Sequence, residues 1–553
     1  MNKDIDKLKE IMRDQKVDLY LLPTQDEFLG EYVSDHGKRL EYLTNFTGSN
    51  GMAIFNTKGQ DYFYTDGRYM LQASKQLDPG FKIVDMREEP LSQKLKSLTA
   101  EGLTLGIDPK LHNISQIEVI SKVVPQDRRV FIESNIVDDI WKNKPKAFYS
   151  DIGMHPLKFA GESHGNKKAK ILEKLREGGV DAVIVMNPHS VCWLLNIRGR
   201  DLDYTPLLLA RAILHKSGDI DLFCNNSADE EVIKYFADNN ISLNPSEKFE
   251  SKIENLKSHK VSISKSSPYW LKMKLPNALI EVDYCEYPKA IKNKVELEGA
   301  KIAHERDGKA VTKLIEWVQN SVSKGEDITE YDVLKKSVEF RAEQKNFACP
   351  SFPTIAGFRE NGAIIHYKPD ESSKKISGNG LLLIDSGGQY LEGTTDITRT
   401  ISIGKPTKEQ IHDFTLVLKG YIAVASAKFK PGTTGEYLDK LARQYLKEDG
   451  KDYAHGTGHG VGSFLSVHEG PHSISHVSKV PFAPGMIVSI EPGYYKEGEY
   501  GIRIESLAFV KENGSILEFE ILTQCEISED LINFTLLSED EKNYLNSYKT
   551  TKK

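Results

Sequence analysis

A cluster of histidines near the C-terminal end of the chain could bind a metal ion or move a proton. Five of the fifteen histidines lie in the 22 residues from His455 to His476, in and just beyond the stretch HGTGHGVGSFLSVHEGPH. This density exceeds chance, and imidazole is both a metal ligand and a proton carrier near neutral pH. His472 and His476 also fit surface positions. His455 and His459 are expected to face the same side of a glycine-flanked strand.

The five residues His468–His472, HEGPH, match the HExxH pattern of zinc proteases. In those enzymes both histidines share one helix face. Here Gly470 and Pro471 take the middle positions, and a helix interior loses about 1 kcal/mol with glycine and about 3 kcal/mol with proline. The glycines that alternate from Gly456 to Gly462 fit no dinucleotide-binding loop either. They favour a strand that backbone or substrate approaches closely.

Four acidic residues stand in apolar or strand-like surroundings, where a carboxylate is costly unless it is paired or bound to a metal. Asp385 ends the apolar run LLLID, and Asp396 lies in the alternating segment GTTDITRTISI. A hairpin through the intervening glycines would bring both onto one face. Glu491 follows MIVSI, and Glu505 lies in GIRIESLAFV. Each one alone fits an ordinary strand-end or helix-cap carboxylate, but all four in one region indicate a metal site.

Oxygen-rich ligation with one imidazole, from His459, favours Mn²⁺, Co²⁺ or Fe²⁺ over ions that prefer thiolates. Bridging carboxylates are typical of paired ions. Two metals about 3.5–4 Å apart can share a hydroxide nucleophile and stabilise a tetrahedral intermediate. The sequence therefore predicts a dinuclear hydrolytic centre.

The elements that precede this region indicate an internal duplication. KLKEIMRDQKVDLYLLP, from Lys7, and KILEKLREGGVDAVIVMNP, from Lys170, are each an amphipathic helix followed by a strand and a proline-bearing loop. YLTNFTGS at Tyr42 is echoed by WLLNIRGR at Trp193. Segments about 150–160 residues apart are too distant for a solenoid and fit two successive α/β domains. Two unrelated helix–strand units would also give this pattern, because such units are common.

A third region begins near Lys292 with a long helix, followed by strands with helices between them. Ser538 and Glu541 predict a capping box that opens a final helix. We expect α/β domains at residues 1–156 and 157–292 and a catalytic domain at residues 293–553. The linkers would lie near residues 150–165 and 285–295. The apolar face of the long helix should contain Val311, Leu314, Ile315 and Val318.

Composition and charge limit the class of protein. The chain is 39% hydrophobic and 28% charged, and its net charge of −7 gives no reason to expect nucleic acid or an anionic membrane as a partner. The first residues, MNKDIDKLKEIMRDQK, predict an amphipathic helix instead of a signal peptide. The sequence has no apolar run of about 18 residues, so we expect no membrane-spanning segment. Five scattered cysteines indicate free thiols in the cytoplasm.

Long stretches of the chain resemble metallopeptidase family M24, the pita-bread fold of methionine aminopeptidase, prolidase and aminopeptidase P. The resemblance is greatest to its cytosolic, three-domain Xaa-Pro aminopeptidases and covers nearly the whole chain. It implies an α/β (α+β) fold with two creatinase-like N-terminal domains before a pita-bread catalytic domain. The matching stretches are TDGRYMLQASKQL, WLLNIRG, SFPTIAGFRENGAIIHYKP, LIDSGGQYLEGTTDITRT, HGTGHGVGSFLSVHEGP, MIVSIEPGYY and GIRIES, in the family's order.

The resemblance implies a metal-binding role for five residues. Asp385 would bind one metal ion, and Asp396 and Glu505 would bridge both ions. His459 and Glu491 would bind the other. Two divalent ions are implied, with Mn²⁺ expected first and Zn²⁺, Co²⁺ or Fe²⁺ as alternatives.

The resemblance also implies roles for residues around the metals. His366 and His468 would contact the substrate and stabilise or protonate the tetrahedral intermediate, as an imidazole can. His455 would line the pocket for a proline ring. Arg503 would orient Glu505.

The implied reaction is hydrolysis of the bond between an N-terminal residue and a penultimate proline, in a cytoplasmic homodimer. That amide lacks an N–H, and the proline ring restricts the chain. A prolidase, which cleaves Xaa-Pro dipeptides only, is a rival, although prolidases of this fold usually carry one N-terminal domain. An inactive pita-bread module that binds peptide or histone is another. Such modules lose metal ligands, and here all five positions are filled.

Overall fold

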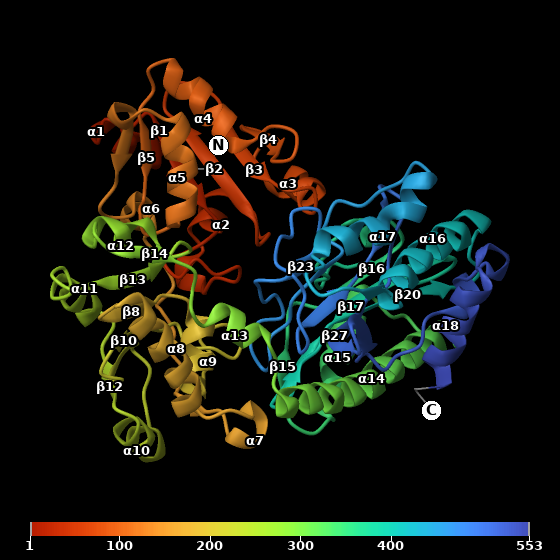
Figure 1. Cartoon of the computed structure of the whole chain (residues 1–553). Helices are drawn as coiled ribbons and strands as arrows, with labels where there is room; N and C mark the ends of the chain where they lie inside the picture. Colours follow the sequence, from red (N-terminus) through yellow and green to blue (C-terminus); the bar gives the residue numbers. More distant parts are fainter. Residues whose placement is uncertain (1–2, 551–553) are drawn as a thin grey trace. The chain divides into compact units, whose positions relative to one another are not determined.

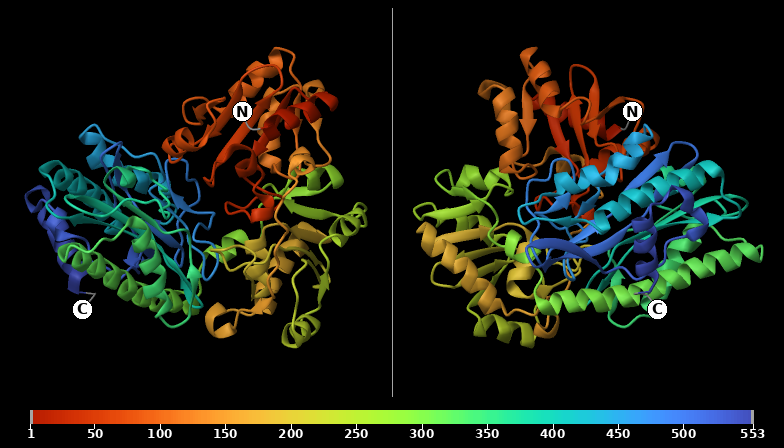
Figure 2. Two further views of the ribbon diagram at one scale, coloured as in Figure 1. Left: turned by 180° about the vertical axis from the view of Figure 1, so that it is seen from behind. Right: turned by 45° about the vertical axis from the view of Figure 1, so that its right-hand side comes forward.

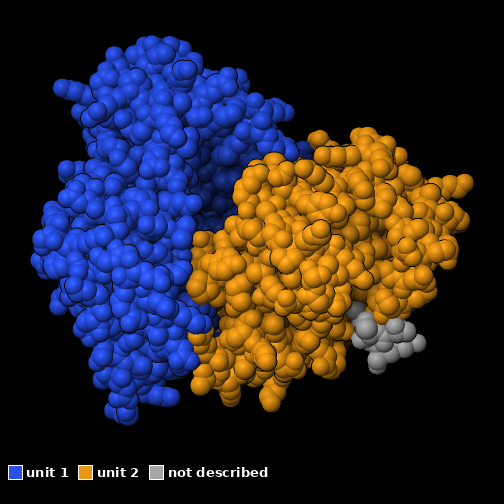
Figure 3. Space-filling model, viewed as in Figure 1, with its two compact units in different colours: residues 1–155, 163–202, 207–285 blue, residues 156–162, 203–206, 286–553 orange. Residues whose placement is uncertain are grey.

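The computed structural model describes residues 3–550. Contacts divide the chain into two compact units (Figure 3). Unit 1 comprises residues 1–155, 163–202 and 207–285, and unit 2 comprises residues 156–162, 203–206 and 286–553. All five candidate metal ligands belong to unit 2. Among the described residues, no helix combines the length and the apolar character that crossing a membrane requires.

Unit 1 begins with a six-stranded mixed sheet in the order β4-β3-β2-β1-β5-β6 (Figure 1). Strand β1 pairs antiparallel with β2 and parallel with β5. Helix α1 (Lys3–Asp14) buries Ile5, Leu8 and Met12, as its amphipathic pattern predicts. The other elements are β1 (Leu19–Pro23), α2 (Arg39–Thr44), β2 (Gly51–Asn56), β3 (Asp61–Thr65), α3 (Met70–Gln76), β4 (Phe81–Asp85), α4 (Leu91–Ala100), β5 (Leu105–Ile107), α5 (Ile114–Val123), β6 (Arg129–Phe131) and α6 (Ile136–Ile140).

A second six-stranded sheet in unit 1 has the order β12-β11-β10-β8-β13-β14. Strand β8 pairs antiparallel with β10 and parallel with β13. The two sheets therefore share both strand order and pair directions. The elements are α8 (His164–Gly178), β8 (Ala182–Val185), α9 (Pro188–Leu195), β10 (Arg211–His215), β11 (Ile220–Phe223), α10 (Glu230–Asp238), β12 (Ile241–Asn244), α11 (Lys248–Glu254), β13 (Val261–Ser264), α12 (Tyr269–Lys274) and β14 (Leu279–Glu281), with the small pair β7 (Gly153–Met154) and β9 (Ile197–Arg198).

The duplication extends to the residues that end equivalent helices. Helix α2 is followed by Asn45 at φ 61°, and α9 is followed by Asn196 at φ 53°, both left-handed. Asparagine is one of the few residues other than glycine that adopts this conformation readily. The internal duplication predicted from YLTN and WLLN is confirmed.

In unit 2, strands lie between α14 on one side and α16 and α17 on the other (Figures 1 and 2). One core joins α14 (Lys294–Ser323) and α15 (Glu330–Ala342) to the sheet β16-β17-β20. A second joins α16 (Lys408–Ala425), α17 (Gly435–Glu448) and α18 (Glu539–Thr550) to β24, β27 and β28. The remaining elements are α7 (Leu157–Ala160), α13 (Glu286–Ala290), β15 (Phe347–Pro350), β16 (Ile355–Phe358), η3 (Arg359–Ala363), β17 (Gly380–Ser386), β18 (Gly388–Tyr390), β19 (Gly393–Thr394), β20 (Ile397–Ile403), β21 (Lys428–Phe429), β22 (Gly458–His459), β23 (Ser473–Ile474), β24 (Ile487–Ile490), β25 (Gly493–Lys496), β26 (Tyr500–Arg503), β27 (Ser506–Asn513) and β28 (Ile516–Ile521).

Helix α14 starts where the third region was expected. The Asn293 side chain accepts the N–H groups of Val295 and Glu296, and the Glu296 carboxylate accepts the N–H of Asn293. This capping box satisfies donors that the first turn leaves free. The predicted box of Ser538 and Glu541 likewise opens α18. On the predicted apolar face of α14, three of the four residues are fully buried and one is half-buried: Val311, Leu314, Val318 and Ile315.

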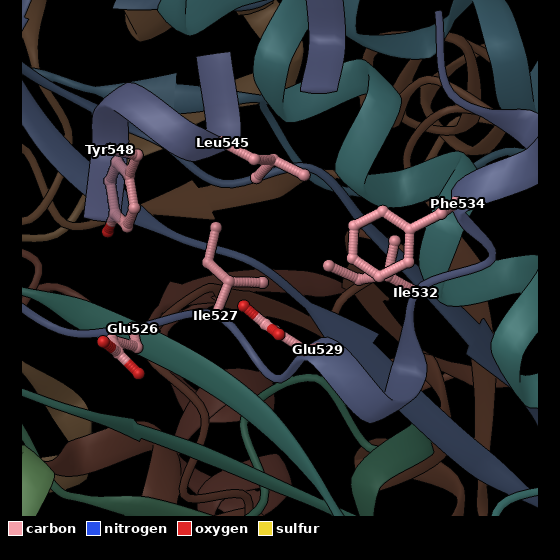
Figure 4. Close-up of a pocket in the computed structure, with 7 residues that line it drawn as sticks. All are labelled: Glu526, Ile527, Glu529, Ile532, Phe534, Leu545 and Tyr548. Atoms are coloured by element: carbon pink, nitrogen blue, oxygen red, sulfur yellow. The ribbon is translucent and has the colours of Figure 1, made fainter. Parts of the chain in front are cut away.

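A small cavity lies beside α18, near the C-terminal end of unit 2 (Figure 4). Its volume, about 10 Å³, is what one water molecule needs. None of the candidate metal ligands or histidines lines it, so it is not the expected substrate site. The lining residues are Glu526, Ile527, Glu529, Ile532, Phe534, Leu545 and Tyr548.

Gly420 of α16 allows α17 to pack closely, and this generates a stability prediction. A Cβ at Gly420 would lie 2.2 Å from the backbone oxygen of Ala442 in α17. We expect Gly420→Ala to destabilise the protein by about 1–3 kcal/mol, measured as a lower thermal unfolding midpoint. Gly165→Ala in α8 is the control, because the nearest atom to its Cβ is 3.9 Å away. Equal midpoints for the two variants would contradict the close-packing argument.

Candidate metal centre

The five predicted metal ligands lie at the ends of strands. Asp385 is the penultimate residue of β17 and pairs with Thr398 of β20. Because β17 and β20 are antiparallel, Asp396, directly before β20, lies at the same end of the sheet. The predicted hairpin is confirmed, with the short strands β18 and β19 inside its connection. The other three ligands are His459 in β22, Glu491 directly after β24 and Glu505 between β26 and β27.

The ligand side chains converge. His459 Nε2 lies 3.5 Å from Asp396 Oδ2 and 3.4 Å from Glu491 Oε1. Ligand atoms of Asp396, His459 and Glu505 all fall within 4.8 Å of one another. Burial first, and then neighbouring carboxylates that include Asp385 and Glu491, raise the pKa of both Asp396 and Glu505 well above the usual range. The structure thus brings all five residues together.

Three carboxylate oxygens in this group have no donor. Asp385 Oδ1, Asp396 Oδ1 and Glu505 Oε1 are buried and lack a hydrogen-bond partner among the described residues. A buried carboxylate oxygen without a donor is costly, and a cation would satisfy it. Four carboxylates and one imidazole are also the donor types that Mn²⁺ and similar ions accept. The residues present therefore fit a metal site.

Arg503 makes hydrogen bonds to two parts of the ligand set. Its Nη2 donates to Asp385 Oδ2 at 2.5 Å, and its Nε donates to Thr398 Oγ1 at 3.1 Å. Thr398 Oγ1 in turn donates to Glu505 Oε2 at 2.7 Å. Arg503 thus pairs directly with Asp385 and reaches Glu505 only through Thr398. This indirect link is compatible with the expected role of Arg503 in orienting Glu505, and the direct pairing with Asp385 is a further contact that the sequence did not predict.

Ser489 links two ligands of the same set, and sequence analysis missed it. Its Oγ accepts the N–H of His459 at 2.9 Å and donates to Glu491 Oε1 at 3.1 Å. Such a contact fixes a ligand's orientation without touching the metal. Its only signal in the sequence is a hydroxyl inside the apolar run MIVSI.

His455 is held in one tautomer. Its Nδ1 lies 2.8 Å from the carbonyl oxygen of Gly456, so Nδ1 carries the proton. In the neutral ring Nε2 then accepts the hydroxyl proton of Tyr495, 2.8 Å away. The Tyr495 oxygen itself accepts from Arg503 Nη1 at 2.6 Å. A hydrogen-bonded chain therefore runs from His455 through Tyr495 and Arg503 to Asp385.

His468 lies beside a metal ligand, but the HEGPH segment is not a helix. The ring centroids of His468 and His459 are 4.3 Å apart in an edge-to-face arrangement. His472 is buried, at 1% exposure, and its Nε2 donates to the carbonyl oxygen of Ile487 at 2.7 Å. The surface position considered for His472 was wrong, and the zinc-protease pattern is excluded.

Glu469 of the same segment is enclosed by two buried lysines. Lys289 Nζ lies 2.8 Å from its Oε2, and Lys292 Nζ lies 2.6 Å from its Oε1. Burial raises the pKa of Glu469, but the charges of Lys289 and Lys292 outweigh burial and lower it to about 2. Both lysines fell in the predicted linker, where no local pattern reveals a partner so far along the chain.

His366 follows η3 by three residues and is half-buried. Turn η3 packs on β26, so closely that a Cβ on Gly501 would lie 1.8 Å from the carbonyl oxygen of Gly362. Since β26 also carries Arg503, the loop that contains His366 borders the ligand set.

The alternating glycines allow close backbone approach, as predicted. A Cβ at Gly458 would lie 1.9 Å from the carbonyl oxygen of Ser489, and one at Gly460 would lie 2.1 Å from that of Glu469. Regular strand is nevertheless confined to β22, followed by an isolated bridge from Gly460 to Val488.

A second group of side chains, His412, Asp413 and Asp449, could also bind a metal ion. This group already pairs with the positive charge of a lysine. Lys451 Nζ lies 2.7 Å from Asp413 and 2.6 Å from Asp449. The lysine charge opposes the binding of a metal ion there, so a substitution in this group is a control for metal binding at the five-residue site.

Comparison with known families accounts for almost the whole chain. Residues 298–512 match metallopeptidase family M24, and residues 515–551 match the C-terminal region of that family. Residues 5–139 and 143–296 each match a creatinase/prolidase N-terminal domain. A probable Xaa-Pro aminopeptidase P from Laccaria bicolor is 37% identical over 98% of this chain and 88% of its own. This chain belongs to metallopeptidase family M24.

Solved structures agree with this M24 assignment. An X-prolyl aminopeptidase from Caenorhabditis elegans, described as a cytosolic enzyme with a di-nuclear active site, has a TM-score of 0.95 and 31% identity, covering 99% of this chain and 95% of that one. The prolidase from Pyrococcus horikoshii OT3 has a TM-score of 0.53 and 27% identity, covering 66% of this chain and 99% of that one. The predicted α/β (α+β) fold, with two creatinase-like domains before an M24 domain, is confirmed. The protein is therefore a metallopeptidase.

The raised pKa values of Asp396 and Glu505 predict that metal binding releases a proton. Raised pKa values mean that this pair binds protons more tightly than ordinary carboxylates do, so an entering cation competes with protons. We expect calorimetric titration with Mn²⁺ at pH 7 to release protons, measured from the dependence of the heat on buffer ionisation enthalpy. Apparent affinity should rise with pH, because higher pH removes the competing proton. Asp449→Asn, in the second group, should behave as the parent protein. Buffer-independent heats in the parent protein would contradict this prediction.

Proposed function

We propose that the protein is a metal-dependent aminopeptidase that removes the N-terminal residue from peptides with proline at the second position (Xaa-Pro-Yaa). One observation carries this proposal: a complete set of four carboxylates and one histidine, with buried oxygens that lack donors, in a chain 37% identical to a probable Xaa-Pro aminopeptidase P over 98% of its length.

The five ligands divide between two ions in this proposal. Asp385 would hold one ion, His459 and Glu491 would hold the other, and Asp396 and Glu505 would serve both. Mn²⁺ is the proposed ion, with Zn²⁺, Co²⁺ and Fe²⁺ as alternatives, because the donors are mainly carboxylate oxygens. When bound, the two ions supply a water of lowered pKa and positive charge for the tetrahedral intermediate.

Two histidines handle protons and developing charge. His366 and His468 donate to the oxygen of the scissile carbonyl and protonate the proline nitrogen as it leaves. The ring of His468 lies 4.3 Å from that of the ligand His459, which supports a role next to the reacting carbonyl.

His455 serves as a wall of the proline pocket. Both its ring nitrogens are engaged, one with Gly456 and the other with Tyr495. The ring is therefore fixed and presents carbon atoms to the substrate. The Xaa-Pro amide offers no N–H to a binding site, so a rigid surface shaped for the ring would supply the specificity.

The proposal includes the organisation of the chain and its location. The domains are residues 1–156, 157–292 and 293–553, and the protein forms a homodimer, as the family commonly does. It is cytoplasmic: all five cysteines are free, four of them are buried, and free thiols persist in a reducing compartment. The C. elegans X-prolyl aminopeptidase is likewise described as cytosolic.

A comparison of two substrates tests the function against its rivals. We expect the Mn²⁺-loaded protein to release Xaa from Xaa-Pro-Pro and to leave the dipeptide Xaa-Pro largely intact, measured by mass spectrometry. Asp396→Ala and His459→Ala should lose cleavage and keep a native circular dichroism spectrum. Cleavage of the dipeptide alone would indicate a prolidase. Metal binding without cleavage of either peptide would indicate a peptide-binding module.

Removal of the His468 imidazole should affect chemistry more than metal binding. We expect His468→Ala to lower kcat about 10²–10⁴-fold, the range for a lost general acid, with nearly normal metal content by mass spectrometry. His476→Ala is the control, because His476 is exposed in the same stretch. Loss of metal from His468→Ala would instead give His468 a ligand role.

A further inference from the structure

Glu330 is a buried carboxylate that the proposed chemistry does not use. It is the first residue of α15 and is 0% exposed. No lysine or arginine pairs with it among the described residues, and all its side-chain partners are neutral donors. A carboxylate in such a place is costly unless its hydrogen bonds are satisfied, so the bonds that it makes define its role.

The side-chain hydrogen bonds of Glu330 come from one short loop, and the backbone of Lys374 adds a further favourable interaction. Oε1 accepts the N–H of Phe358 at 2.7 Å and Asn361 Nδ2 at 3.0 Å. Oε2 accepts Asn361 Nδ2 at 3.0 Å and the hydroxyl of Tyr367 at 2.8 Å. The carboxylate therefore ties the start, the middle and the end of residues 358–367 together.

This loop needs such a tie because its backbone is tightly wound. Arg359 adopts φ 54°, a left-handed conformation that favours glycine. The turn is so close that a Cβ on Gly357 would lie 2.7 Å from the nitrogen of Gly362. Strain of this kind persists only where the surroundings over-determine it, and Glu330 supplies hydrogen bonds on both sides of the turn.

The loop carries His366, directly before the Tyr367 that Glu330 holds. Its other anchor is the contact of Gly362 with Gly501 on β26, the strand of Arg503. The position of the His366 backbone is therefore set by the metal-site strand on one side and by Glu330 on the other.

We propose that Glu330 is a positioning residue for peptide hydrolysis: by binding Phe358, Asn361 and Tyr367 it fixes the loop that aims His366 at the substrate. This inference rests on the proposed function, in which His366 contacts the reacting carbonyl. Glu330 touches neither substrate nor metal and acts only through His366.

Two variants disrupt the hydrogen bonds between Glu330 and the loop while keeping the side-chain volume nearly unchanged. Glu330→Gln replaces one acceptor oxygen by an NH₂ group that faces the donors of Asn361 and Tyr367. Tyr367→Phe removes the hydroxyl that donates to Glu330 next to His366, together with its contacts to Asn361 and Ser373, and it keeps the test available where Glu330→Gln folds poorly. We expect Glu330→Gln to lower kcat about 10- to 100-fold, as small misplacements of a catalytic group do. KM and metal content should stay within about threefold of the parent values, since the ligands are untouched.

The decisive measurement is a double-mutant cycle with His366→Ala. If Glu330 acts through His366, Glu330→Gln should lower kcat by less than about twofold in the His366→Ala background. The matched control is Asp332→Asn in the same helix, which loses the capping bonds to Thr329 but makes no bond to the loop. It should lower the unfolding midpoint without lowering kcat.

Several outcomes would overturn the inference. They are an undiminished effect of Glu330→Gln on the His366→Ala background, an equal loss of kcat in Asp332→Asn, and an unchanged kcat in both loop variants. A second readout does not depend on cleavage: the imidazole ¹H–¹⁵N signal of His366 should shift or broaden in Glu330→Gln while other histidine signals stay. If the parent protein cleaves no Xaa-Pro peptide, the proposed function fails. An unchanged His366 signal overturns the positioning inference separately.

Discussion

The repulsion among four carboxylates, three of them buried and Glu491 half-buried, is the constraint on which the M24 site depends. Two like charges 4 Å apart repel by about 4 kcal/mol at an effective dielectric constant of 20. One arginine, Arg503, pairs with a member of the set, Asp385. Burial and mutual charge raise the pKa of Asp396 and Glu505 as a consequence. The strand ends must hold these carboxylates together against their repulsion. Two cations that enter this preassembled site would relieve the repulsion, and this favours their binding. Hydrogen bonds from Thr398 to Glu505 and from Ser489 to Glu491 complete that frame.

A buried glutamate fixes the backbone beside each of the two proposed proton-donating histidines, but the two glutamates are stabilised differently. Beside His468, Glu469 meets two lysines, so its charge is compensated within a dry environment. Beside His366, Glu330 meets only neutral donors. The first arrangement joins the segment before α14 to the histidine loop, and the second joins α15 to another loop. Helices outside the site thereby fix the backbone of catalytic loops without supplying a group to the reaction.

Local sequence was enough to find the candidate metal ligands, which the structure brings together, and the duplicated domains, because those features are anomalies within short windows. A carboxylate that ends an apolar strand, such as Asp385, is conspicuous wherever the chain folds. Pairings between distant segments leave no such trace: Lys292 and Glu469 are 177 residues apart. The resemblance linked Arg503 to Glu505, but its direct pairing with Asp385, 118 residues away, has no signal in the local sequence. His472 also fitted a surface position, because nothing near it in the sequence indicates that its ring donates a hydrogen bond to the carbonyl oxygen of Ile487 in β24.

The HEGPH segment shows that the same residue pattern has different chemistry when its backbone conformation differs. In a zinc protease the glutamate of HExxH is a base that accepts a proton from water. Here no helix forms, and the same glutamate points away to Lys289 and Lys292, whose charges overcome burial and hold its pKa at about 2. A carboxylate of such low basicity cannot accept a proton near neutral pH. Its ion pairs hold the backbone next to His468, and the proposed metal ligand is instead His459, on a strand whose flanking glycines allow close backbone approach.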